Sequence, residues 1–170
     1  GMPGAFYRNV NRGKRETRLD LKTETGRTVL RALVRESHVL VESFRPGVME
    51  RLGLDYAKLA ELNPKLVYCA ITGYGVKGPF SQRPGHDLNY LAYAGVLDQI
   101  ATTDGMPVIP NIQIADLLGG ALPAVTRILA ALWHVSRGGD GAFIDLSMTH
   151  SIHASNVIAQ ATLDNAAGGM

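Results

Sequence analysis

The sequence predicts an α/β protein with an open, mostly parallel, Rossmann-like sheet flanked by helices. Three observations indicate this class. Short strand-like runs alternate with amphipathic helical stretches, the most apolar run is typical of a buried parallel strand, and the loop after that run is rich in glycine and proline. Ligands of open α/β sheets bind at the carboxyl ends of the strands, so we expect a site beside that loop.

The composition is that of a globular domain. The chain has 170 residues, 46% of them apolar and 19% charged, and a single cysteine. These values exclude a disordered chain and a disulfide scaffold. No run approaches the roughly 18 apolar residues of a membrane helix, and the start does not resemble a signal peptide. We therefore expect a cytoplasmic protein, with Gly1 left over from cloning before a native start at Met2.

The first third of the chain predicts a strand, a helix and a second strand. Residues 18–22 alternate apolar and polar positions, as a short strand does. Either Thr23 or Thr25 could cap the helix that follows, whose apolar residues recur at helical spacing over 29–34. Residues 39–42 form the second predicted strand.

A turn and two short helices precede the most apolar strand. Residues 45–47 form the turn, and the two helices are separated near Gly53 and end at Asn63. The third predicted strand, residues 66–72, is apolar enough to be buried on both faces.

Loops and a long helix occupy the middle of the chain. Residues 73–85 form the Gly/Pro loop, a helix begins near residues 85–87, and residues 100–111 form a second loop. Apolar residues follow helical spacing from Ile114 to Trp133, and Pro123 should kink or divide this helix because proline lacks the required amide.

The last part of the chain predicts one more strand and a helix. A glycine-rich break at 138–141 precedes the strand 143–147. The chain then looks helical from Thr149 until the helix dissolves over residues 165–169.

Positive charge is concentrated near the amino terminus. Residues 1–51 contain eleven Lys and Arg against six Asp and Glu, whereas the remainder contains six against nine. This balance favours a phosphorylated ligand, with a solvated basic face as the equal alternative. Nucleic acid is disfavoured because only Phe6 and Tyr7 accompany the basic patch and no nucleic-acid-binding motif is present. Neither GxGxxG nor GxxxxGK[ST] occurs, so a nucleotide-binding fold with those signatures is not supported. The densest basic cluster is Arg8, Arg12, Lys14, Arg15, Arg18 and Lys22.

Five strings together match one family. They are NRGKRETRLDLKTETGR (11–27), VLVESFRPGVMERLGLDY (39–56), NPKLVYCAITGYGVKGPF (63–80), GHDLNYLAYAGVL (85–97) and IADLLGG (114–120). In this order they resemble the family III CoA-transferases (the CaiB/BaiF family), and within that family most closely the α-methylacyl-CoA racemases. The resemblance implies an acyl-CoA thioester as substrate, no covalently bound cofactor, and an interlocked homodimer in the full-length family. It implies neither a membrane nor a nucleic-acid partner.

The resemblance also implies residues that bind coenzyme A. One family stretch at the coenzyme matches Leu19, Asp20, Leu21 and Lys22. A second matches Gly85, His86, Asp87, Leu88, Asn89 and Tyr90. The basic cluster, together with Lys22, Arg45 and Arg51, would serve the nucleotide and its phosphates, to which lysine and arginine give charge-assisted hydrogen bonds. For each arginine taken singly, a surface role is an equal alternative.

Of the five histidines, His86 stands out. It follows the Gly/Pro loop at the expected ligand edge, and a helix amino terminus favours the neutral imidazole that can accept a proton. The other four, His38, His134, His150 and His153, are expected to be structural. His150 and His153 lie three residues apart but lack a third ligand, so we predict no metal site.

Asp116 is the second catalytic candidate. From the sequence alone, the favoured interpretation is that Asp116 only caps the apolar helix. The alternative is a role at a ligand site, because Gly119 and Gly120 would let a ligand approach the backbone. The resemblance reverses this weighting, because the family's catalytic aspartate matches Asp116. With His86 it would exchange the α proton of a 2-methylacyl-CoA thioester. The alternative is a CoA-transferase that uses Asp116 as nucleophile.

The chain departs from the family at both ends. Compared with the family pattern, we expect this chain to lack the opening β-α unit and the second, smaller domain, and Ala142 stands where the family commonly has a glutamine. We expect residues 8–150 to form a partial CoA-binding and catalytic domain, and 151–170 a helical tail leading toward the absent domain. A non-catalytic CoA-binding or dimerising fragment is therefore a further alternative.

Overall fold

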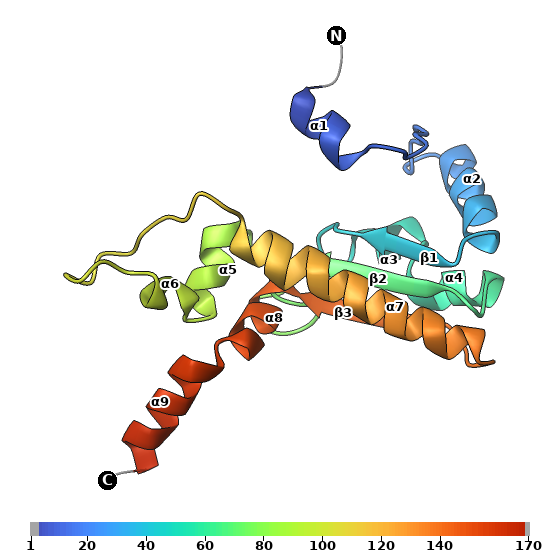
Figure 1. Cartoon of the computed structure of the whole chain (residues 1–170). Coiled ribbons are helices and arrows are strands. Elements are labelled where there is room, and N and C mark those ends of the chain that lie inside the picture. The colour runs from blue at the N-terminus through green and yellow to red at the C-terminus, as the bar shows by residue number, and fades with distance from the viewer. Residues whose placement is uncertain (1–3, 169–170) are drawn as a thin grey trace.

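The computed structural model describes residues 4–168, which are built around an open sheet of three parallel strands (Figure 1). The strands are β1 (Val39–Glu42), β2 (Val67–Thr72) and β3 (Ala142–Ser147), in the order β1-β2-β3. In the register Val39 is level with Val67, and Val67 with Ala142. The predicted fold class and these three strands are confirmed. Residues 66–72 were expected to be the most buried run, and β2 is the central strand.

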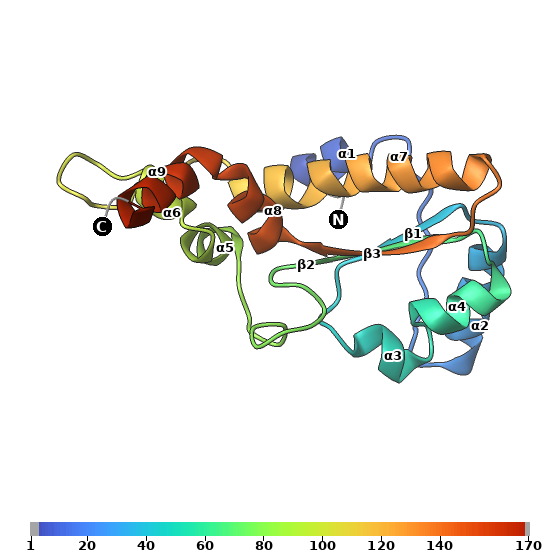
Figure 2. The ribbon, with the colours of Figure 1, turned by 90° about the horizontal axis from the view of Figure 1, so that it is seen from below.

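Helices cover both faces of the sheet, as Figure 2 shows edge-on. One face carries α7 (Leu122–Ser136). The other carries α2 (Glu24–Arg35), α3 (Val48–Leu52) and α4 (Tyr56–Leu62). Two groups of buried side chains fill these layers. Under α2 to α4 the group is Val34, Met49, Leu54, Leu59, Leu66, Tyr68 and Ala70, and under α7 it is Cys69, Ala124 and Leu146.

Residues 18–22 do not form the predicted strand. The Asp20 carbonyl accepts hydrogen bonds from the Thr23 amide (3.1 Å) and the Thr23 hydroxyl (2.8 Å), so the chain turns here into α2. Leu21 packs against the core, whereas Lys22 is exposed. The alternation therefore reflects one-sided burial of a segment that pairs with no neighbouring strand among the described residues.

The caps and turns follow from local chemistry. Thr23, not Thr25, caps α2, because its hydroxyl accepts a hydrogen bond from the Gly26 amide at 3.1 Å. Gly47 has φ 86° and joins β1 to α3, a left-handed conformation that favours glycine. Asp55 caps α4 by accepting from the Lys58 amide. The predicted turn and the two short helices are confirmed.

The long apolar helix was predicted to kink or divide at Pro123; it changes its hydrogen-bonding pattern just before this residue but is not interrupted there. Residues Ala115–Ala121 form a π-helix, η1, which continues into α7 with Pro123 in its first turn. Because the backbone passes Pro123 without a gap, Ala115–Ser136 is one helix, long and apolar enough by length and composition alone to cross a membrane. No such run was expected from the sequence. Helices in the core of soluble proteins meet the same criterion, so this length and composition are only weak evidence for a membrane-spanning helix.

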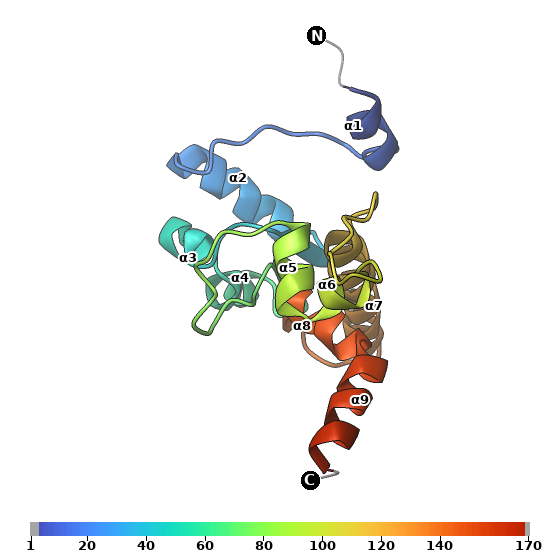
Figure 3. The same cartoon turned by 90° about the vertical axis from the view of Figure 1, so that its left-hand side faces the viewer.

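The remaining helices extend from the end of the sheet at which the strands terminate. They are α5 (Asp87–Tyr93), α6 (Val96–Gln99), α8 (Met148–Ser155) and α9 (Val157–Gly168). Helix α9 includes residues 165–168, where the sequence predicted that the helix dissolves; Gly169 lies outside the described residues. A short helix that was not predicted, α1 (Ala5–Val10), lies on the opposite side of the molecule from α9 (Figure 3).

Candidate active site

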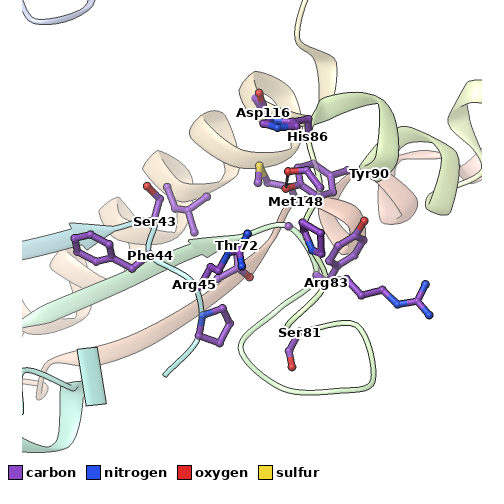
Figure 4. Close-up of a pocket in the computed structure, with 16 residues that line it drawn as sticks. Ser43, Phe44, Arg45, Thr72, Ser81, Arg83, His86, Tyr90, Asp116 and Met148 are labelled. Atoms are coloured by element: carbon purple, nitrogen blue, oxygen red, sulfur yellow. Dashed lines mark hydrogen bonds between the residues drawn. The ribbon is translucent and has the colours of Figure 1, made fainter. Parts of the chain in front are cut away.

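A cavity of about 400 Å³ opens at the carboxyl edge of the sheet (Figure 4). Segments that follow all three strands meet here: the turn after β1, the Gly/Pro loop after β2 and the start of α8 after β3. This is the edge at which the sequence predicted a site. The lining residues are Ser43, Phe44, Arg45, Pro46, Ile71, Thr72, Gly73, Tyr74, Ser81, Arg83, Pro84, Gly85, His86, Tyr90, Asp116 and Met148.

His86 and Asp116 lie together at one end of this cavity (Figure 4). His86 is the residue before α5, and its amide donates a 2.9 Å hydrogen bond to Asn89 Oδ1. Asp116 lies in the first turn of η1, and its amide donates a 2.9 Å hydrogen bond to Asp87 Oδ1. The first turn of α5 therefore fixes the backbone of both candidates.

The electrostatic surroundings of Asp116 suit proton transfer. Partial burial raises the pKa of Asp116 above its ordinary value of 3.8, and the negative charge of Asp87 raises it further. A protonated His86 opposes this and lowers the pKa of Asp116. A carboxyl group with a raised pKa is a stronger base when ionised and more readily keeps a proton to donate.

Tyr90 forms one wall of the cavity because two glycines leave room for its ring. A Cβ on Gly73 would lie 2.3 Å from Tyr90 Cε1, and one on Gly85 would lie 2.6 Å from the same atom. The Tyr90 hydroxyl donates a 2.6 Å hydrogen bond to the Gly85 carbonyl. Burial raises the pKa of Tyr90, so its hydroxyl stays protonated as a donor.

The Gly/Pro loop is held to the ends of two strands. The Gly75 amide donates to Thr72 Oγ1 at 2.8 Å, and the Val76 amide donates to both carboxylate oxygens of Asp145 at 3.1 and 3.2 Å. The Thr149 hydroxyl donates to the Gly73 carbonyl at 2.7 Å. These contacts give the cavity a fixed rim on the side of β2 and β3.

Two arginines line the cavity. Arg45 was predicted from the resemblance, and Figure 4 shows it beside Thr72. Arg83 was not predicted; its guanidinium lies 4.4 Å from the centre of the Phe80 ring and donates to the Tyr93 hydroxyl at 2.9 Å. Figure 4 shows its side chain turned outward from the cavity. The sequence signal for Arg83 was its position within the Gly/Pro loop, three residues before His86.

The structure brings only part of the predicted binding set to the cavity. Gly85, His86, Tyr90, Arg45 and Asp116 line it. The predicted residues that do not line it are Leu19, Asp20, Leu21, Lys22, Arg51, Asp87, Leu88 and Asn89.

Much of the basic cluster lies on the amino-terminal arm (residues 4–22), none of which lines this cavity. Figure 1 shows helix α1 of this arm apart from the sheet. The arm has its own hollow of about 370 Å³, lined by Tyr7, Asn11, Lys14, Arg15, Glu16 and Thr17. Glu16 partly balances the charge there by accepting hydrogen bonds from Tyr7 and Arg18.

Gly119 and Gly120 serve helix packing rather than the ligand approach expected from the sequence. A Cβ on Gly119 would lie 2.5 Å from Ile152 Cγ1 and 2.9 Å from the Met148 carbonyl oxygen. On Gly120 it would lie 3.2 Å from the Met148 side chain. Both glycines are buried and let η1 approach α8 closely.

Of the two histidines on α8, His153 has contacts of its own. His153 Nδ1 lies 3.4 Å from the Ala94 carbonyl oxygen, and its Nε2 lies 3.0 Å from the Gln160 side-chain nitrogen. Within residues 4–168 no group of three or more His, Cys, Asp or Glu is arranged to hold a metal ion.

The parallel sheet, covered by helices on both faces and with a cavity at its carboxyl edge, defines an open α/β domain. The whole chain, residues 1–170, matches the model of CoA-transferase family III, and the chain belongs to this family. The resemblance drawn from the five strings is thereby confirmed.

Curated relatives include both racemases and transferases. The human alpha-methylacyl-CoA racemase is 43% identical over 148 residues, which are 86% of this chain and 39% of the relative. The succinate–glutarate CoA-transferase of Agrobacterium fabrum is 39% identical over 147 residues, 86% of this chain and 36% of the relative. The chain thus spans less than two fifths of these relatives.

Solved structures of the family share the fold. A CaiB/BaiF family protein from Brucella suis superposes with a TM-score of 0.82 at 36% identity, covering 94% of this chain and 42% of that one. Rv3272 from Mycobacterium tuberculosis superposes with a TM-score of 0.82 at 34% identity, covering 91% and 43%. The family is enzymatic, and its members include both CoA-transferases and racemases.

Proposed function

We propose that this chain supplies the proton-transfer pair of an epimerase acting on the α carbon of 2-methylacyl-CoA thioesters, with His86 and Asp116 as the two acid/base groups. The observation that carries this proposal is the meeting of both side chains at one end of a single cavity. Two different acid/base groups are what inversion requires, since one removes a proton and the other returns one to the opposite face.

The reaction follows from this arrangement. Neutral His86 takes the α proton, and the electron pair of the C–H bond moves into the thioester to form an enolate. Protonated Asp116 then gives its proton to the opposite face of the α carbon, and the enolate electrons form the new C–H bond. The opposite epimer uses the two groups in reverse. The raised pKa of Asp116 supports its role as a donor.

Coenzyme A would be held by cations and backbone donors at the same edge. Arg45 lines the cavity and suits a phosphate. The enolate oxygen needs hydrogen-bond donors, and the backbone near Gly85 is the candidate, since Gly119 and Gly120 face α8. Because the chain spans less than two fifths of the human racemase and of the Agrobacterium fabrum transferase, the complete site and its substrate are proposed for the whole protein.

The test is incorporation of solvent deuterium at the α carbon of a 2-methylacyl-CoA, followed by mass spectrometry. We expect exchange by the wild type, and its loss in both H86A and D116N. As a matched control, D98N alters an exposed aspartate of α6 and should leave exchange unchanged. The epimerase proposal fails if the wild type shows no exchange while moving CoA between carboxylic acids.

A CoA-transferase is the second candidate, favoured by relatives such as the succinate–glutarate enzyme. Here the ionised Asp116 attacks the thioester carbonyl, expelling CoA thiolate and leaving a mixed anhydride; the thiolate then attacks the aspartyl carbonyl and releases the acid. His86 would not be required. Hydroxylamine should trap Asp116 as a hydroxamate during turnover, and its absence would count against this chemistry.

We also propose a cytoplasmic homodimer. Leu122, Leu129 and Trp133 expose 58%, 61% and 67% of their surface on α7, which supports association with another surface. Light scattering after size exclusion should give twice the chain mass, and a monomer at all concentrations contradicts this.

A chain that binds CoA in calorimetry without exchange or transfer supports the non-catalytic alternative.

A further inference from the structure

The first turn of α5 holds both acid/base candidates through side chains that do not line the cavity. Asn89 Oδ1 accepts from the His86 amide, and Asp87 Oδ1 accepts from the Asp116 amide, each at 2.9 Å. The second bond joins residues 29 positions apart in the sequence and connects the start of α5 to the start of η1. This hydrogen bond is therefore a tertiary contact between the two helices at whose starts His86 and Asp116 lie.

The Asp87 carboxylate is well suited to this link. The first amides of a helix have no partner within it, and an ionised acceptor forms a stronger hydrogen bond than a neutral one. Asp87 is half-buried, and within residues 4–168 none of the ion pairs formed in the structure involves it. No ion pair among these residues therefore competes with the hydrogen bond that the Asp87 carboxylate accepts from the Asp116 amide.

We propose that Asp87 is a positioning residue, which fixes Asp116 opposite His86 so that the two can act on opposite faces of one carbon. This inference rests on the proposed epimerase function. It gives Asp87 a different task from the coenzyme contact that the family resemblance implied.

A positioning role has an electrostatic consequence that packing alone does not have. The groups acting on Asp116 are Asp87, which raises its pKa, and His86, which lowers it. Tyr90, also on α5, is acted on by both aspartates. From the other packed elements, α8 carries His150 and His153, α7 carries Arg127 and β3 carries Asp145; none of these contributes to the shift at Asp116.

Two variants separate the hydrogen bond from the charge. D87N keeps a side-chain oxygen that can accept but removes the charge, whereas D87A removes both. With ¹³C-labelled aspartate, NMR titration should show the Asp116 pKa lowered in both variants. Hydrogen exchange at the Asp116 amide should stay slow in D87N and accelerate about tenfold or more in D87A. D98N is the control and should change neither.

The activity readout belongs to the whole protein. In deuterium exchange, D87A should lower kcat by about tenfold to a hundredfold with little change in KM, because misplacing an acid/base group slows chemistry more than binding. D87N should retain more activity and show an altered acid limb of the pH profile. Circular dichroism of both variants should match the wild type.

The outcomes separate this inference from the proposed function. If D87A leaves Asp116 amide exchange unchanged, or D87N leaves its titration unchanged, Asp87 does not position Asp116, whatever the activity. If D87A unfolds, the D87N titration decides alone. If both NMR changes occur but the wild type exchanges no α proton, the positioning role stands and the epimerase proposal fails.

Discussion

The Tyr90 hydroxyl donates a 2.6 Å hydrogen bond to the Gly85 carbonyl, while the Tyr90 ring fills the space that a Gly85 side chain would occupy. A Cβ on Gly85 would lie 2.6 Å from Tyr90 Cε1 and 2.9 Å from the Tyr74 hydroxyl. The residue before His86 is therefore fixed by a packed wall of aromatic rings. This wall includes Tyr74 and Tyr90, whose ring centres lie 5.2 Å apart in an edge-to-face arrangement.

Substituting Gly85→Ala should displace Tyr90 and the backbone that carries His86. We expect a loss of about 1–3 kcal/mol in the free energy of unfolding, typical of overpacking, measured by urea denaturation. Tyr90→Phe is the matched comparison, because it removes the hydrogen bond without a clash and should cost about 1 kcal/mol. If G85A is as stable as the wild type, the wall adapts freely and does not fix His86.

The amino-terminal cap of α2 offers a second test with a built-in control. Thr23 Oγ1 accepts from the Gly26 amide, whereas Thr25 is exposed inside the helix. Thr23→Ala should lower the free energy of unfolding by about 1 kcal/mol, and Thr25→Ala should change it little or raise it. Equal effects of the two substitutions in urea denaturation would contradict the assignment of the cap.

Much of the fold is predictable from the sequence because it depends on local patterns. The three strands and α2 to α4 follow from apolar periodicity and from turn residues such as Gly47 and Gly53. Residues 18–22 show the limit of this reasoning. Alternation reports which side chains are buried, and Leu21 is partly buried by the core without any strand pairing.

The site is less predictable, because it depends on contacts between distant segments. The loop composition located His86, and the family resemblance located Asp116. The bond from the Asp116 amide to Asp87, by contrast, depends on how α5 meets η1. The same holds for Gly119: a small residue in a helix indicates a close approach, but the sequence does not say whether a ligand or a helix approaches.

Gly119→Ala tests whether this glycine serves helix packing. The added methyl group would meet Ile152 Cγ1 at 2.5 Å and the Met148 carbonyl oxygen at 2.9 Å, so η1 and α8 must separate. We expect a loss of about 1–3 kcal/mol in the free energy of unfolding. In the double variant G119A/I152A, truncation of Ile152 makes room for the methyl group added at position 119. The double variant should therefore be about 0.5–3 kcal/mol more stable than the sum of the two single losses predicts. Strict additivity would show that the two residues do not compete for space.

The raised pKa of Asp116 makes a prediction about stability and pH. The native state holds the proton of this carboxyl more tightly than the unfolded chain, whose pKa is near 3.8. As the pH rises from that value through the native pKa, ionisation therefore favours the unfolded state, and the contribution of Asp116 to stability falls. Asp116→Asn removes the titrating group and should not show this decline.

Urea denaturation of both proteins between about pH 3 and pH 7 measures this difference, a range that spans ordinary carboxyl titration. The stability of D116N relative to the wild type should rise with pH and then level off above the native pKa of Asp116. Glu42, whose pKa is also raised, first by burial, titrates in both proteins, so its contribution cancels in the difference. A pH-independent difference, or one that declines as the pH rises, would show that burial and Asp87 do not hold a proton on Asp116.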